Sequence, residues 1–121
     1  MSAGLRHLGN VVQTQREVCQ RNAAAFLGSP DELKVGISDQ ALHGALPLHG
    51  LRHHPRDDTT GWYIWSGEYS TDPDFFKPLH VQHLVEAGSP VTRFLGLAPG
   101  WRFMVADGHE DVWYDQTLLE K

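Results

Sequence analysis

The sequence has only one cysteine, Cys19, among 121 residues. A single cysteine excludes an internal disulfide framework, which makes a reducing, cytoplasmic compartment the default expectation. No apolar run approaches the roughly 20 residues that a transmembrane helix needs. The opening residues, MSAGLRHLGNVV, also lack the apolar segment of about 7–15 residues that a secretion signal contains. The sequence therefore predicts one cytoplasmic domain without a membrane span.

Positive charge is scarce in the second half of the chain. Residues 57–121 carry four Lys or Arg against eleven Asp or Glu, a net charge of −7, whereas residues 1–56 have a net charge of +2. A surface this acidic repels the phosphates of nucleic acids, so DNA or RNA binding is not expected. Complementary charge speeds association with a basic protein partner. An acidic surface that only keeps the protein soluble explains the same composition, and charge alone leaves both interpretations open.

Catalytic motifs are missing as well. The chain has no Cys-x-x-Cys or His-Glu-x-x-His metal motif, no Gly-x-Ser-x-Gly nucleophile turn and no complete phosphate-binding loop. Cys19 falls on the apolar stripe of a predicted helix, where a buried structural cysteine is typical. Glu68 with Asp72 or Asp74 has the residue types of a general acid and base, but acids in a turn are more often solvated caps. We therefore expect no enzyme activity, no catalytic residues and no cofactor.

Histidine is abundant, with eight residues in the chain. Zinc needs three or four nitrogen, sulfur or oxygen ligands that converge at about 2.0–2.3 Å. An alternative function is therefore a zinc-type enzyme or metal sensor that combines the histidine-rich loop at 49–54 with two histidines on a predicted helix. Histidines in a polar loop are more often solvated or hydrogen-bonded, which is the competing interpretation. The expected ligands of the alternative are His53, Asp58, His80 and His83.

Apolar periodicity and turn residues predict an α+β fold. Residues 47–60 show no periodic pattern. The other elements predict a small, mostly antiparallel sheet of about four to five strands, packed by an N-terminal helix and two short central helices. The domain is expected to span residues 11–121, after a loose leader at 1–10. The expected elements are a helix at 11–27, a strand at 33–38, a helical turn at 39–46, a strand at 62–66, a helix at 78–87, a short helix from Ser89 to Gly96 and a hairpin at 101–114.

The C-terminal hairpin has the most specific local signal, because Asp107-Gly108 separates two alternating runs. A two-residue loop at this position pairs Trp101 with Tyr114 on one face of the hairpin. On the other face, Arg102 lies opposite Trp113. The first face is mostly apolar and is expected in the core.

The run GWYIWSGE at 61–68 is bulky on both faces of its strand. Alternation places Trp62 and Ile64 on one face, and Tyr63 and Trp65 on the other. One pair is expected under the helices, and the other pair is expected to share the second face with Arg102 and Trp113 of the hairpin. Alternation alone does not decide which pair is buried.

Aromatic and acidic residues together suggest a binding surface. Trp, Tyr and Arg anchor protein interfaces, because they bury a large area at a low cost in rotamer entropy. Exposed aromatic strands equally suit a homodimer contact. Phe75 and Phe76 are expected to fold back into the core. The expected partner-binding residues are Trp65, Glu68, Tyr69, Asp72, Asp74, Arg102, Asp111, Trp113 and Asp115, and a second candidate surface consists of His49, Arg52, His53 and His54.

Four segments, in order, resemble the immunity protein 33 family, once catalogued as a domain of unknown function. They are LKVGISDQALHG, GLRHHP, DDTTGWYIWSGEYSTDPDFFKPLHVQHL and LGLAPGWRFMVADGHEDVWYD. The most specific pieces are Thr60-Gly61-Trp62, Trp65-Ser66-Gly67-Glu68 and Asp111-Val112-Trp113, and the resemblance covers residues 33–119. It implies a bacterial, cytoplasmic α+β protein of a polymorphic-toxin system that neutralises a cognate toxin by stoichiometric binding without a cofactor. It assigns no role to the histidine-rich loop.

Overall fold

The computed structural model describes residues 3–120, and the side chains of residues 10–120. A six-stranded sheet runs through this part of the chain, which confirms the α+β prediction with more strands than expected. The strands are β1 (Lys34–Ile37), β2 (Leu48–Arg52), β3 (Thr59–Ser66), β4 (Lys77–His80), β5 (Trp101–Ala106) and β6 (His109–Tyr114). The helices are α1 (Ala3–Arg21), α2 (Asp39–Leu42) and α3 (Val81–Glu86), with the 3₁₀ helices η1 (Pro90–Phe94) and η2 (Gln116–Leu119).

The sheet has the strand order β4-β1-β3-β2-β5-β6. Strands β1 and β3 are parallel, and the other neighbouring pairs are antiparallel. The register aligns Ile37, Ile64, Gly50 and Phe103 across four strands. Because residues that are directly opposite share a face, this row defines the apolar face of the sheet.

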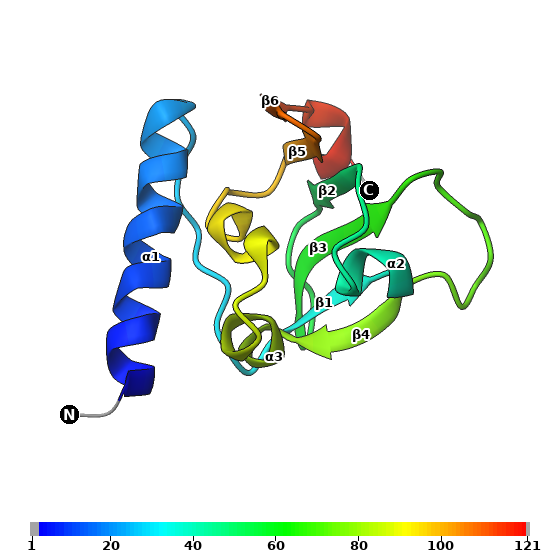
Figure 1. Cartoon of the computed structure of the whole chain (residues 1–121). Helices are drawn as coiled ribbons and strands as arrows, with labels where there is room; N and C mark the ends of the chain where they lie inside the picture. Colours follow the sequence, from blue (N-terminus) through cyan, green and yellow to red (C-terminus); the bar gives the residue numbers. More distant parts are fainter. Residues whose placement is uncertain (1–2, 121) are drawn as a thin grey trace.

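Helices cover that apolar face. α1, η1 and α3 lie on the same side of the sheet in Figure 1, and α1 packs against η1. Phe103 of the sheet stacks on Phe94 of η1, with 4.1 Å between ring centroids, and Trp62 donates its indole N–H to the carbonyl of Leu95. Trp62 and Ile64 are therefore the pair under the helices. The buried core among the described residues consists of Val18, Cys19, Val35, Ile37, Ala41, Leu48, Trp62, Ile64, Val81, Leu84, Val85, Val91, Phe94, Leu95, Leu97 and Phe103.

The predicted hairpin is confirmed in position and register. Trp101 lies opposite Tyr114, and Arg102 lies opposite Trp113. Gly108 in the turn has φ +71°, a left-handed conformation that glycine adopts without steric cost. The short helix expected after Ser89 is η1, and the Ser89 side chain accepts a hydrogen bond from the N–H of Val91.

The bounds of the N-terminal helix differ from the prediction of 11–27. α1 begins at Ala3, inside the segment expected to be a loose leader, and ends at Arg21. Gly4 and Gly9 have low helix propensities, so local sequence does not explain this earlier start. At the other end, Ala23 has φ +53° and the N–H of Ala24 bonds back to the carbonyl of Cys19, a left-handed helix termination.

The stretch without a predicted pattern, 47–60, contains the central strand β2. Leu48, Gly50 and Arg52 face the covered side of the sheet and are buried. A Cβ on Gly50 would lie 2.1 Å from the ring of Phe103, so this position admits glycine alone. A buried face made of one leucine, one glycine and one arginine shows no hydrophobic alternation, which is why the strand was missed.

The helix predicted at 78–87 divides into an edge strand and a shorter helix. Pro78 lies in β4, opposite Gly36 of β1, and α3 starts only at Val81. Proline fits an edge strand because its missing N–H removes no ladder bond on the solvent side. Proline is favoured both at the first position of a helix and in an edge strand, so Pro78 alone does not distinguish the two.

Candidate functional site

The sheet face opposite α1, η1 and α3 is here named the open face. The register places two rows of side chains across it. The rows are Trp65, His49, Met104 and Asp111, and Tyr63, Leu51, Arg102 and Trp113. The expectation that Tyr63 and Trp65 share a face with Arg102, Asp111 and Trp113 is therefore confirmed.

The indole of Trp65 is covered, although it lies on the open face. Its ring stacks on His49 at 5.2 Å and meets Tyr69 edge-on at 5.3 Å between centroids. Trp65 is only 6% exposed, whereas Tyr69 is 59% exposed. Trp65 therefore supports the loop at 67–76, and Tyr69 presents the accessible ring. Burial, and then the positive charge of Arg102, lowers the pKa of His49 below its ordinary value, so the stacked imidazole is neutral at pH 7.

Phe75 and Phe76 do not reach the core under the helices, contrary to expectation. The two rings pack on each other at 4.9 Å, and Phe76 also meets the ring of Tyr63 at 5.2 Å. The loop at 67–76 folds back over the open face, where Trp65 and Tyr63 offer the nearest apolar surface. The interior under the helices is filled by residues from other elements.

Trp113 is the exposed indole of the open face, with 39% of its surface accessible. The guanidinium of Arg102 lies 5.5 Å from the Trp113 ring and donates to Asp115 at 3.0 Å. Asp115 also accepts from the hydroxyl and the N–H of Thr117, and so caps η2. The Thr117 hydroxyl first, and then Arg102, lowers the pKa of Asp115 below 3.8. The Trp113 ring therefore contacts Arg102 on one side, and part of its surface remains accessible.

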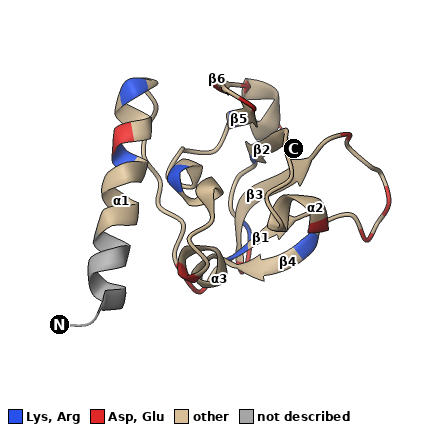
Figure 2. Ribbon diagram, in the orientation of Figure 1, with Lys and Arg blue, Asp and Glu red and all other residues tan. Residues whose placement is uncertain are grey.

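The remaining acidic residues of the predicted surface are exposed. Figure 2 shows Asp and Glu along the loop between β3 and β4 and along β6. Glu68, Asp72 and Asp74 lie in that loop, where the Asp72 carboxylate accepts the N–H of Asp74. Within residues 10–120, none of these three carboxylates lies within ion-pair distance of a Lys or Arg. Asp111 is 3.6 Å from the imidazole of His109.

Arg52 does not belong to a second surface, because it is 1% exposed. Its guanidinium donates to the carbonyl oxygens of Thr60, Leu27 and Leu97 at 2.7–2.9 Å, with longer bonds to Leu95 and Gly28. Burial lowers the pKa of Arg52 to about 10, which leaves the side chain charged at pH 7. The residue joins β2 to η1 and to the segment after α1, so its role is structural. His49, His53 and His54 remain at or near the surface.

The side chains of the metal alternative are not brought together. The Nδ1–H of His53 donates to the Leu118 carbonyl, and Asp58 pairs with Lys34 at 2.8 Å. The rings of His80 and His83 meet edge-on at 5.8 Å, and His80 lies opposite Lys34, the residue that pairs with Asp58. No group of three or more His, Cys, Asp or Glu side chains is placed to hold a metal ion in the part of the chain that the structure describes.

Sequence reasoning missed Leu51, which lies on the open face between Tyr63 and Arg102. Tyr63, with 39% of its surface exposed, was expected on this face but was not among the predicted binding residues. The alternation of His49 and Leu51 against Leu48 and Gly50 is the signal that would have found Leu51. It was obscured because Arg52 is a buried residue of polar type.

The structure defines a small α+β protein in which α1, η1 and α3 cover one face of a mixed sheet. Among the described residues, no helix has both the length and the apolarity to cross a bilayer. The family model of the Imm33-like domain matches residues 14–115, and the chain belongs to the Imm33-like family. The resemblance to the immunity protein 33 family is thereby confirmed. Neither the curated proteins nor the solved structures contain a match.

Proposed function

We propose that this chain is a bacterial immunity protein that neutralises a cognate toxin by stoichiometric binding in the cytoplasm. The family supports an immunity role, and the exposed part of the open face supports binding. The observation that carries the proposal is the exposed indole of Trp113 beside the exposed carboxylate of Asp111, on a face whose loop at 67–76 adds three carboxylates that have no Lys or Arg partner within residues 10–120. The protein acts by occupying the toxin and not by catalysis.

The exposed aromatic and acidic residues are expected to contribute to binding in different ways. Trp113 and Tyr69 supply large, rigid rings that desolvate at low entropic cost, which is what anchors an interface. Glu68, Asp72 and Asp111 are exposed at opposite ends of the same face. Complementary charge at such positions raises the association rate with a basic protein. Trp65 contributes indirectly, because it supports the loop that presents Tyr69.

The charge of the face also distinguishes between two occupants. In a two-fold homodimer the same surface patch meets itself, so each carboxylate would approach the carboxylates of the second copy. Like charges in that position oppose association. A basic toxin, in particular an enzyme that acts on a polyanion, meets the same carboxylates favourably. The proposed partner is therefore a basic toxin.

Co-purification with the product of the adjacent gene tests the proposal directly. Trp113→Ala and Asp111→Lys are expected to weaken binding of that toxin by about tenfold or more each, as truncation of an interface anchor does. Both variants are expected to keep a melting temperature close to that of the unchanged protein, because both side chains are exposed.

Tyr114→Ala is the matched control. Tyr114 follows Trp113 in β6, is exposed, and contacts Trp101 on the other side of the sheet. The control is expected to leave toxin binding unchanged. If Trp113→Ala and Asp111→Lys leave binding unchanged while the toxin still co-purifies, the binding face is wrong. If no gene product co-purifies, the immunity assignment itself is wrong.

A further inference from the structure

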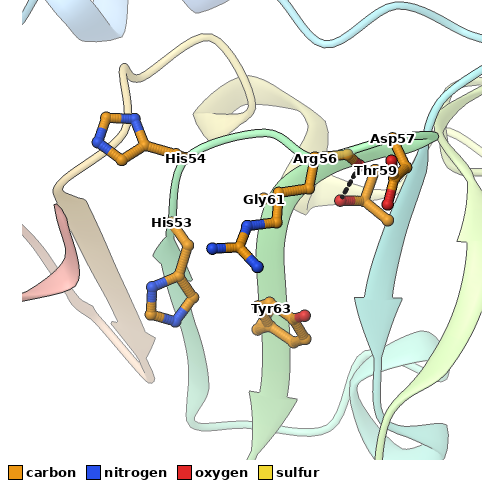
Figure 3. Close-up of a pocket in the computed structure, with 7 residues that line it drawn as sticks. All are labelled: His53, His54, Arg56, Asp57, Thr59, Gly61 and Tyr63. Carbon is orange, nitrogen blue, oxygen red and sulfur yellow. Dashed lines mark hydrogen bonds between the residues drawn. The ribbon is translucent and has the colours of Figure 1, made fainter. Parts of the chain in front are cut away.

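The histidine-rich loop forms one side of a hollow whose histidine and arginine side chains have no part in the proposed toxin binding. The hollow has a volume of about 350 Å³ and lies where β2 turns into β3. His53, Arg56, Thr59 and Tyr63 contribute to its walls (Figure 3). This volume lies at the lower end of the roughly 300–1,000 Å³ typical of small-molecule sites.

Arg56 is the cation of the hollow and has no anionic partner within residues 10–120. In Figure 3 its guanidinium reaches into the space between His53 and Tyr63, while the carboxylate of Asp57 lies beyond Thr59. Asp58 does not compete for Arg56, because it pairs with Lys34 at 2.8 Å. An arginine with no partner and a planar fork of donors suits a carboxylate or a phosphate.

The backbone around Arg56 is held in place before any ligand binds. Both the N–H and the hydroxyl of Thr59 donate to the Arg56 carbonyl, at 2.8 and 2.9 Å. Gly61 has φ +90°, and a Cβ at that position would lie 2.1 Å from the carbonyl oxygen of His53. His53 is itself oriented by its bond to the Leu118 carbonyl, at 3.0 Å. Such fixed geometry lowers the entropic cost of binding.

A second, less polar hollow adjoins the first. It has a volume of about 190 Å³, and its walls are Leu51, His53, Tyr63, Tyr69 and Phe76. His53 and Tyr63 line both hollows, so the two adjoin at these side chains and are together named the depression. One end of this depression offers a guanidinium, and the other end offers aromatic and aliphatic surface.

We propose that this depression binds a free small molecule that joins a carboxylate or phosphate group to an aromatic or apolar group. The oxyanion accepts from the guanidinium of Arg56. The apolar group occupies the hollow beside Phe76. Asp57 is the one acidic side chain of the hollow and opposes the anion. This site shares Tyr69 with the proposed toxin surface, but its test uses the purified protein without a toxin, so either proposal can fail without the other.

The test is a titration of the purified protein followed by backbone amide resonances in ¹H–¹⁵N spectra. The probes are phenyl phosphate, inorganic phosphate, which lacks the ring, and phenol, which lacks the charge. Phenyl phosphate is expected to give saturable shifts confined to the depression, in residues 51–63 and around Phe76. It is expected to bind about tenfold more tightly than inorganic phosphate, because the ring buries apolar surface. Phenol is expected to give no saturable shift.

Three variants separate this site from general attraction of anions. Arg56→Gln is expected to weaken binding of phenyl phosphate about tenfold or more, because it removes a charge-assisted hydrogen bond. Arg21→Gln makes the same change in charge at the end of α1, on the other side of the sheet from the depression. It is expected to leave binding unchanged. Asp57→Asn is expected to tighten binding about twofold to threefold by removing the opposing charge. Asp57 has φ +50°, a conformation that asparagine tolerates well, so this variant keeps the turn.

Equal weakening by Arg56→Gln and Arg21→Gln would overturn the proposal, because it would indicate binding by net charge alone. Absence of saturable shifts with phenyl phosphate in the unchanged protein would also overturn it. If Arg56→Gln does not fold, as judged by loss of dispersion in its spectrum, Asp57→Asn decides. Unchanged or weaker binding in Asp57→Asn then refutes the site, and tighter binding supports it.

Discussion

Replacement of Arg52 by methionine tests whether this buried cation joins β2 to η1 and to the segment after α1. Arg52 is 1% exposed and donates to three carbonyl oxygens at 2.7–2.9 Å, those of Thr60, Leu27 and Leu97. Methionine has a similar length but no donor, so these carbonyls lose their partners inside the protein. Each buried acceptor left unsatisfied costs about 1–3 kcal/mol. Three such acceptors cost about 3–9 kcal/mol, and removal of the buried charge recovers part of this, so we expect Arg52→Met to lower the free energy of unfolding by about 3–6 kcal/mol.

Arg52→Lys distinguishes the contribution of the charge from that of the guanidinium geometry. Lysine keeps the charge, but its single ammonium group cannot span acceptors on β3, on the segment after α1 and after η1 at once. We expect it to lose about half as much stability as Arg52→Met. The measurement is urea unfolding followed by tryptophan fluorescence, which reports on this region because Trp62 lies 5.6 Å from the guanidinium.

Arg21→Met serves as the control, because Arg21 is an exposed arginine at the end of α1. It is expected to change the free energy of unfolding by less than about 1 kcal/mol. A loss of less than about 1 kcal/mol in Arg52→Met would refute the reasoning. It would mean that the carbonyls find other donors and that Arg52 does not hold the elements together. If Arg52→Met is too unstable to purify, Arg52→Lys still gives a measurable loss.

Three further predictions concern stability and reactivity. Ala23→Gly is expected to stabilise the protein by about 1 kcal/mol in the same urea assay, because φ +53° strains alanine but not glycine; destabilisation would contradict this. The pKa of Asp115 is lowered in the folded state, so its carboxylate contributes stability above pH 3.8 that is lost as the pH falls through the folded pKa. Asp115→Asn is therefore expected to be less stable than the unchanged protein at pH 7, and this difference should shrink towards about pH 3; a constant difference would refute it. Burial raises the pKa of the Cys19 thiol above 9.0. At pH 8 the thiol is therefore expected to react with a disulfide reagent at least about tenfold more slowly in the folded protein than in urea. Equal rates would show that Cys19 is accessible.

The parts of the fold that the sequence predicted correctly depend on local interactions. Asp107-Gly108 sets the turn, and a two-residue loop leaves one register for the hairpin, so Trp101 had to pair with Tyr114. Ser89 and Pro90 start η1 by capping and by a preset φ. In each case, residues within a few positions of one another determine the outcome.

The candidate site was predicted in part. The common face of Tyr63, Trp65, Arg102 and Trp113 followed from alternation and is confirmed. The accessibility of the rings did not follow, because Trp65 is covered by Tyr69 and His49 while Trp113 is not. Whether a ring on a known face is exposed depends on loops that pack over it from elsewhere in the chain.

By itself, the sequence determined the α+β class, the hairpin register and the alternation of the run at 61–68. Only the tertiary structure decided that Trp62 and Ile64 lie under the helices, that β2 is a central strand, and that Arg52 is an interior residue. Side-chain alternation has a period of two, so it assigns residues to two faces of a strand. It does not indicate which of the two faces is covered. The covered face is chosen by the elements that pack on it, and four of the five carbonyls that accept from Arg52 come from residues 24 to 45 positions away.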